Sequence, residues 1–175
     1  FVHGACVNEP DDIASVLRKI SNKSLINLGI GGNGPLIEYA SLREYMGKNV
    51  RNVLWFYYEG NDLINLNEEL RSKILKNYLM NLNFKQNLKF KQNEIDNFWR
   101  NQTAESWVKK TNFNFYRFKN LIKIYNTRKL IMNIIFDALP QKKQAVPTEF
   151  KTILQLTNNL TAQNNTKLYF IYLPE

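Results

Sequence analysis

The sequence predicts an α/β domain of three layers, with a parallel sheet between two layers of helices. Two observations support this fold class. Short apolar runs alternate with segments whose apolar residues recur at helical spacing, an order typical of parallel sheets. The chain has 175 residues, of which 44% are apolar and 13% aromatic, which suffices for one packed core. We therefore expect a single domain over residues 1–175, with both ends lying inside a larger domain.

Helix and strand signals alternate through the first third of the chain. Pro10 and the two acids that follow it suit the first turn of a helix. Residues 24–28 are predicted to form a short buried strand, and residues 29–34 a glycine turn that needs a flexible backbone. Pro35 is predicted to begin a second helix. Residues 50–58 are strongly apolar and predict a second strand.

A helix and a strand are also predicted near the end of the sequence. Pro147 begins a helix that ends at residues 164–165, and residues 167–173 form a last strand before Pro174. In parallel sheets, ligands bind where the carboxyl ends of the strands meet their loops. Three segments are expected at that edge: residues 1–6, 29–34 and 59–62.

The middle of the chain carries most of the positive charge. The whole sequence has 24 basic and 15 acidic side chains, a net charge of +9 with neutral histidine. Residues 66–145 hold 16 of the basic and 6 of the acidic side chains, a net charge of +10, so the rest of the chain is nearly neutral. Helical spacing recurs in residues 68–82, 86–99 and 118–139. We expect residues 66–145 to form a basic helical insertion, a cap with its lysines facing outward.

This insertion has two other interpretations. Residues 113–119 mix aromatic and basic side chains, as nucleic-acid-binding surfaces do, and a basic amphipathic helix after Lys119 suits a membrane surface. A cap is favoured, contact with a membrane surface is the next choice, and nucleic-acid binding is the least favoured. The sequence has no run of eighteen apolar residues and begins without the basic residues of a secretory signal. It therefore does not distinguish a cytoplasmic from a periplasmic location.

A glycine turn and an asparagine are predicted at the same edge of the sheet. There, a backbone N–H of residues 29–34 and the side-chain amide of Asn61 can donate to one oxygen. Acyl transfer needs such a pair, because negative charge develops on the carbonyl oxygen and preorganised donors about 3 Å away stabilise it. Glycine lets a substrate approach the backbone, and asparagine donates without carrying charge. Dinucleotide binding is a weaker interpretation of the turn, because its spacing fits that fingerprint poorly.

Three segments resemble the conserved blocks of the SGNH (GDSL-type) hydrolases. Residues 1–4, Phe-Val-His-Gly, resemble the tail of the Gly-Asp-Ser-x-x-x-Gly block, which implies a nucleophilic serine just before them. Residues 27–33 resemble the second block, which implies that Gly32 is an oxyanion donor. Residues 59–62 resemble the third block, a Gly-x-Asn-Asp pattern, which implies that Asn61 is the other donor.

The resemblance implies a flavodoxin-like fold and a serine ester hydrolase with a Ser-His-Asp mechanism. Its substrate would be a small ester, such as an acetylated sugar or a lipid, and it implies no cofactor and no metal. Glu59 departs from the glycine that the family usually carries there. The Asp-x-x-His block that supplies the base does not occur in this sequence. Nucleophile and base are both expected outside the chain, so the 175 residues alone are expected to be inactive.

The remaining candidates are assigned simpler roles. Cys6 and His3 are the single cysteine and histidine, which excludes a metal site rich in either residue. Cys6 is expected to be a small buried hydrophobe rather than a nucleophile paired with His3. Asp62 is expected to cap a turn or a strand end rather than to orient a histidine. A pairing of Glu59 with Asp62 to cleave glycosidic bonds is a weaker interpretation. The rival function is a non-catalytic basic module that binds an anionic polymer or a membrane surface.

Overall fold

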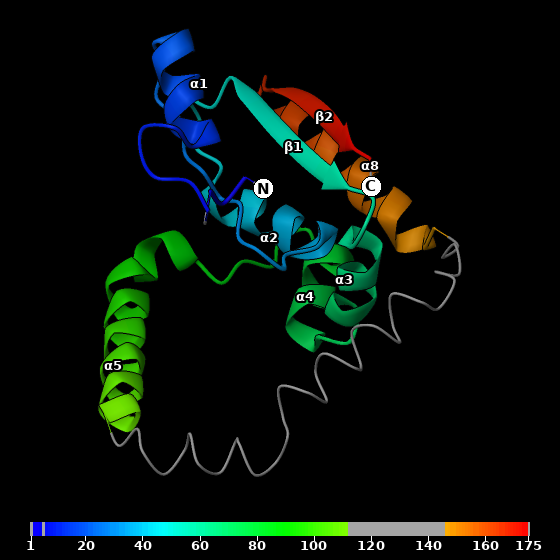
Figure 1. Ribbon diagram of the computed structural model, residues 1–175. Coiled ribbons are helices and arrows are strands. Elements are labelled where there is room, and N and C mark those ends of the chain that lie inside the picture. Colours follow the sequence, from blue (N-terminus) through cyan, green and yellow to red (C-terminus); the bar gives the residue numbers. More distant parts are fainter. Residues whose placement is uncertain (1, 5, 112–145, 175) are drawn as a thin grey trace, which may run out of the picture. The chain divides into compact units, whose positions relative to one another are not determined.

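Figure 1 shows the computed structural model of the chain. It describes residues 2–4, 6–111 and 146–174, and for residues 102–111 it describes the backbone alone. All statements about elements and contacts refer to these residues.

The chain divides into two compact units. Phe1–Lys89 together with Ala145–Glu175 form the first unit, and Phe90–Gln144 form the second. The first unit holds the sheet and the candidate site. Its elements in chain order are α1 (Ile13–Ser21), α2 (Pro35–Tyr45), β1 (Asn52–Tyr58), α3 (Asp62–Glu69), α4 (Lys73–Met80), α8 (Thr148–Gln163) and β2 (Lys167–Leu173).

The strands β1 and β2 pair in parallel along their whole length (Figure 1). Asn52 lies opposite Lys167, and Tyr58 lies opposite Leu173. The α/β class and the parallel pairing that the sequence predicts are therefore confirmed. Within the described residues the sheet has these two strands.

The strand predicted over residues 24–28 is wrong. This segment lies outside the sheet, and the carbonyl of Leu25 accepts hydrogen bonds from the Arg18 guanidinium at 3.1 and 3.2 Å. Ile26, expected to be buried, is 74% exposed. An apolar run becomes a strand only where a neighbouring strand pairs with its backbone N–H and C=O groups. In the described part of the chain, no strand pairs with residues 24–28.

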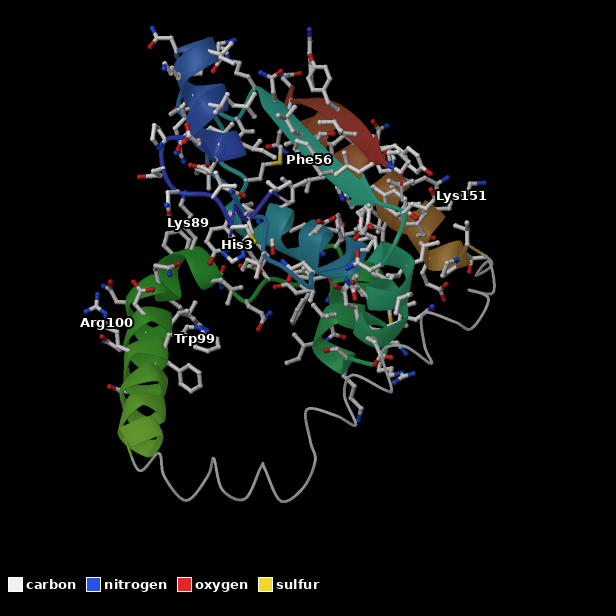
Figure 2. The ribbon with its side chains drawn as sticks, in the orientation of Figure 1. His3, Phe56, Lys89, Trp99, Arg100 and Lys151 are labelled. Carbon is white, nitrogen blue, oxygen red and sulfur yellow. The ribbon has the colours of Figure 1, made fainter. Side chains whose placement is uncertain are left out.

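The core lies on one face of the sheet, against α2 and α8. Trp55 and Tyr57 of β1 are buried on this face, and the ring of Phe150 in α8 lies 5.2 Å from that of Tyr57. Because side chains alternate along a strand, Phe56 points to the opposite face, where Leu54 is exposed (Figure 2). The buried core cluster comprises Leu36, Tyr39, Ala40, Trp55, Leu66, Tyr78 and Ile153.

The single helix predicted over residues 68–82 is replaced by two helices. Helix α3 starts earlier, at Asp62, and ends at Glu69. Helix α4 starts after Ser72, whose hydroxyl accepts a hydrogen bond from the N–H of Leu75 at 3.4 Å. Helical spacing of apolar residues continues across the break, so periodicity alone does not reveal it.

Two side chains of α2 fix the segment that follows α4. The buried Arg43 guanidinium donates to four backbone carbonyls in and after α4, the shortest bond being 2.6 Å to Leu82. The carboxylate of Glu44 accepts from the Tyr78 hydroxyl at 2.7 Å and from two backbone N–H groups beyond α4. Buried charges are tolerated when they are hydrogen-bonded in this way. The chain up to residue 89 therefore packs with the first unit.

In the second unit the structure describes one long helix. The 3₁₀ turn η1 (Leu88–Lys91) leads into α5 (Gln92–Thr111), where the sequence predicts a helix over residues 86–99. The helix predicted over residues 118–139 lies outside the described residues. The packing of residues 66–145 as a cap stays a prediction. Among the described helices, none combines the length and the apolar character needed to cross a bilayer.

Candidate functional site

The glycine turn before α2 presents an open backbone. Gly32 has φ of +88°, in the left-handed region that side chains disfavour, and the N–H of Asn33 closes the turn on the carbonyl of Ile30 at 3.2 Å. A Cβ atom added at Gly31 or Gly32 would meet no atom within 4 Å. Glycine is therefore needed at residue 32 for its conformation, and the space beside the turn is free.

The beginning of the chain lies against this turn. The Asn27 side chain donates to the carbonyl of Val2 at 2.6 Å and accepts from the N–H of Gly29 at 2.9 Å. The N–H of Gly31 donates to Nδ1 of His3 at 3.5 Å (Figure 2). Two of the three segments predicted at the edge of the sheet are thus in contact.

The third segment is in contact with the turn through α3. The amide of Asn65 in α3 donates to the carbonyl of Asn33 at 3.5 Å. A Cβ atom added at Gly34 would lie 2.8 Å from Cβ of Asn65 and 2.9 Å from the backbone nitrogen of Leu66. The backbone of the turn is therefore packed directly on the first two turns of α3.

Asn61 lies at the start of the same helix. It is the N-cap residue of α3, its side chain is exposed, and it makes no capping hydrogen bond. Its carbonyl accepts from the N–H of Asn65 at 2.9 Å, which fixes the backbone of Asn61 in the helix. The two sequence-predicted site residues, Gly32 and Asn61, therefore lie in adjoining segments. That their N–H groups converge on one oxygen stays a prediction.

The side chain of Glu69 connects α3 to the turn and to α2. Its carboxylate accepts from the N–H of Gly34 at 2.5 Å, of Leu36 at 3.0 Å and of Ile37 at 3.4 Å. Pro35 has no N–H, so these are all the backbone donors that the N-terminus of α2 leaves without a helical partner. Glu69 is 6% exposed. A residue of α3 thus caps α2.

Two more carboxyl groups lie close to Glu69 and interact with it electrostatically. Burial raises the pKa of Glu69 and of Asp62, although the backbone N–H groups bonded to each of them act in the opposite direction. Burial raises the pKa of Glu38 to about 8, and the charges of Asp62 and Glu69 add to the shift. The indole N–H of Trp55 donates to Glu38 and acts in the opposite direction, but burial outweighs it. At neutral pH, Glu38 is therefore mostly protonated.

The remaining candidates have more limited roles. Asp62 accepts from the N–H of Tyr58 at 2.8 Å and is buried, which confirms the expected role at a strand end. Glu59 is exposed and accepts from the hydroxyl of Tyr172. Cys6 is exposed and lies in a turn, so its expected burial is wrong. The described residues hold no cluster of three potential metal ligands.

Sequence reasoning missed Glu69 and Glu38. A usable signal was present for Glu69, because Asn61, Asn65 and Glu69 follow one another at intervals of four residues. That spacing places all three on one face of a helix. No such signal marks Glu38, whose perturbed pKa depends on tertiary burial.

Comparisons with known proteins do not place the chain in a family. No family model matches the sequence, and neither the curated proteins nor the solved structures contain a match.

The close packing of Gly34 on α3 gives a first prediction. Gly34→Ala forces a methyl group against the backbone of α3, and such overpacking costs about 1–3 kcal/mol. Gly47→Ala is the matched control, because its Cβ atom would meet no atom within 4 Å, and a change within about 0.5 kcal/mol is expected. Urea unfolding of both variants measures the free energies. Equal stability of the two variants would contradict the described packing.

The burial of Glu38 gives a second prediction. Its pKa rises from 4.5 to about 8 on folding, so the folded state keeps a proton that the unfolded state releases. The free energy of unfolding therefore falls by about 1.4 kcal/mol per pH unit in this window. Glu38→Gln has no ionisable group there and removes this contribution. Chemical unfolding from pH 5 to pH 8 measures the difference between the two proteins, and a difference independent of pH would refute the assignment.

Proposed function

We propose that the chain is the scaffold of a serine ester hydrolase of SGNH type, which deacylates a small carbohydrate or lipid ester. One observation carries this proposal. The turn with Gly32 is packed on α3, the helix that Asn61 precedes as its N-cap residue, and residues 2–3 lie against the same turn. The three-layer, flavodoxin-like arrangement with a larger sheet is part of the proposal.

In this proposal the chain supplies the oxyanion hole. The backbone N–H of Gly32 and the side-chain amide of Asn61 donate to the carbonyl oxygen of the ester as negative charge develops on it. The open space beside residue 32 supports this role, since a substrate can reach the backbone there. So does the absence of a capping bond at Asn61, because its amide is then not committed to its own helix.

The protonation and hydrogen bonding of the neighbouring carboxyl groups weaken their opposition to an oxyanion. Asp62 directly follows Asn61, and an ionised carboxylate beside the site opposes the formation of an oxyanion. The pKa of Glu38, raised by burial to about 8, keeps that carboxyl group neutral at pH 7. The backbone N–H groups that donate to Asp62 and Glu69 partly offset the negative charge of these two carboxylates. The net negative potential beside the site is thereby reduced.

The proposal requires a nucleophile and a base that the 175 residues do not supply. By its resemblance, the serine would precede residue 1 and attack the ester carbonyl, while a histidine would take the serine proton and return it to the leaving alcohol. The beginning of the chain packs on the glycine turn, which is where such a serine would need to be.

A second candidate function is non-catalytic binding to an anionic surface. Phe90 is 86% exposed, and Phe98 and Trp99 are also exposed, with their rings 5.8 Å apart. In the sequence, Lys89 precedes Phe90 and Arg100 follows Trp99. Exposed aromatic and basic side chains together suit an anionic membrane interface. Salt-sensitive binding to anionic vesicles, without ester turnover in the protein that carries the serine and the histidine, would favour this function.

The proposed oxyanion hole predicts a kinetic effect. In the protein that carries both the serine and the histidine, Asn61→Ala is expected to lower kcat for an ester by about 100- to 1000-fold, because one oxyanion donor is lost. Hydrolysis of p-nitrophenyl acetate measures it. The 175-residue chain alone is the blank and is expected to show no turnover.

The matched control is Asn67→Ala, the same substitution at an exposed position of the same helix. Its kcat is expected to stay within about twofold of the parent. Turnover by Asn61→Ala equal to that of Asn67→Ala would remove Asn61 from the mechanism.

A further inference from the structure

We infer that Glu69 is a positioning residue for the oxyanion hole, because it fixes the glycine turn on the helix that carries Asn61. This inference rests on the proposed function for its catalytic meaning, but the positioning itself can be measured separately. In this role the buried carboxylate of Glu69 does not touch the reacting atoms. It holds the two hydrogen-bond donors at a constant separation.

The contacts make α3 a common support for both donors. Asn61 begins this helix and Glu69 is its last residue, so both are parts of one short rigid element. The carboxylate of Glu69 binds the N–H of Gly34, two residues after Gly32. Asn65, between them on the same face of α3, donates to the carbonyl of Asn33. The turn is thus attached to α3 at two neighbouring residues.

The position of Glu69 in its own helix indicates a specific task. An acidic residue at the C-terminus of a helix opposes the helix dipole and is unfavourable there. The N-terminus of α2 provides the compensating interaction, since three N–H groups of that helix point at the carboxylate. Hydrogen bonds to an ionised group are stronger than neutral ones, and their geometry is correspondingly well defined. The bond to Gly34 therefore restricts the adjacent residues of the turn.

The neighbouring Glu68 differs in each of these respects. Its side chain is exposed and forms an ion pair with Arg71 at 2.9 Å on the surface of α3. Glu68 and Glu69 carry the same type of side chain and lie in the same helix, but of these two only Glu69 contacts the glycine turn. Glu68→Gln is therefore a matched control for Glu69→Gln, which removes the charge while preserving the shape of the side chain.

The experiment compares Glu69→Gln, Glu69→Ala and Glu68→Gln in the protein that carries the serine and the histidine. In Glu69→Gln we expect kcat to fall by about 10- to 100-fold, with KM changed by less than about twofold, because misplaced donors weaken transition-state stabilisation alone. Glu68→Gln should leave both constants unchanged. If Glu69 only stabilised the fold, the substitution would lower the amount of folded enzyme but leave kcat per active site unchanged. Active-site titration therefore supplies the enzyme concentration used for kcat.

Backbone NMR relaxation on the same proteins tests the positioning without reference to catalysis. The order parameter of the Gly32 N–H is expected to fall from the range of rigid backbone, about 0.85, towards about 0.6 in Glu69→Gln and to stay unchanged in Glu68→Gln. If Glu69→Ala does not fold, Glu69→Gln still decides the question. An unchanged order parameter at Gly32 in Glu69→Gln, or unchanged kcat in an active enzyme, would overturn the inference.

The two proposals fail in different ways. If the parent protein hydrolyses no ester, the proposed function is wrong, while the relaxation data still decide whether Glu69 holds the turn. If the parent protein is active and Asn61→Ala is impaired, but Glu69→Gln is not, the proposed function stands and the positioning role of Glu69 is wrong.

Discussion

The buried carboxylate of Glu69, bound to three N–H groups at the start of α2, connects the parts of the molecule on which the candidate site depends. It closes the N-terminus of α2, fixes the end of the glycine turn, and attaches both to α3. Without it, the helix terminus would leave buried donors without partners, at a cost of about 1–3 kcal/mol for each group. The sheet also supports this arrangement, because Trp55 of β1 packs in the core with Leu36 of α2 and Leu66 of α3.

The same arrangement includes three carboxyl groups, Glu38, Asp62 and Glu69, that interact electrostatically. Buried carboxylates near one another are unfavourable unless hydrogen bonds or protonation compensate them. Here Glu69 and Asp62 are compensated by backbone N–H groups, and Glu38 by its proton. Carboxyl groups with raised pKa values next to an open glycine turn are of the kind that gathers at functional sites, and they support the proposed site.

Much of the fold follows from local patterns in the sequence. The strands β1 and β2 were predictable because each is a run of β-branched, aromatic and aliphatic residues between polar breaks, and α8 because Pro147 precedes a regular apolar spacing. Residues 24–28 look equally apolar, but strand formation depends on a partner that the local pattern cannot reveal. Likewise, the apolar spacing continues across the break between α3 and α4 and does not reveal it.

The candidate site, like the fold, could be predicted from the sequence only in part. The positive φ of Gly32 and the place of Asn61 before a helix follow from residue types that tolerate those conformations. That their segments lie close together was expected, because both were predicted at one edge of a parallel sheet. The side chains of Asn65 and Glu69 that make the contact were not predicted. The raised pKa of Glu38 could not be predicted, because it arises from burial in the folded chain and from the nearby charges of Asp62 and Glu69.

The convergence of two donors on one oxygen is the central claim, and a crystal structure of the serine-containing protein with a bound phosphonate ester tests it most directly. The tetrahedral phosphonate presents an oxygen in the place of the oxyanion. The account predicts that the backbone nitrogen of Gly32 and the side-chain nitrogen of Asn61 each lie about 3 Å from that one oxygen. An oxygen bound by neither group, or donors that face different sides of the molecule, would contradict it.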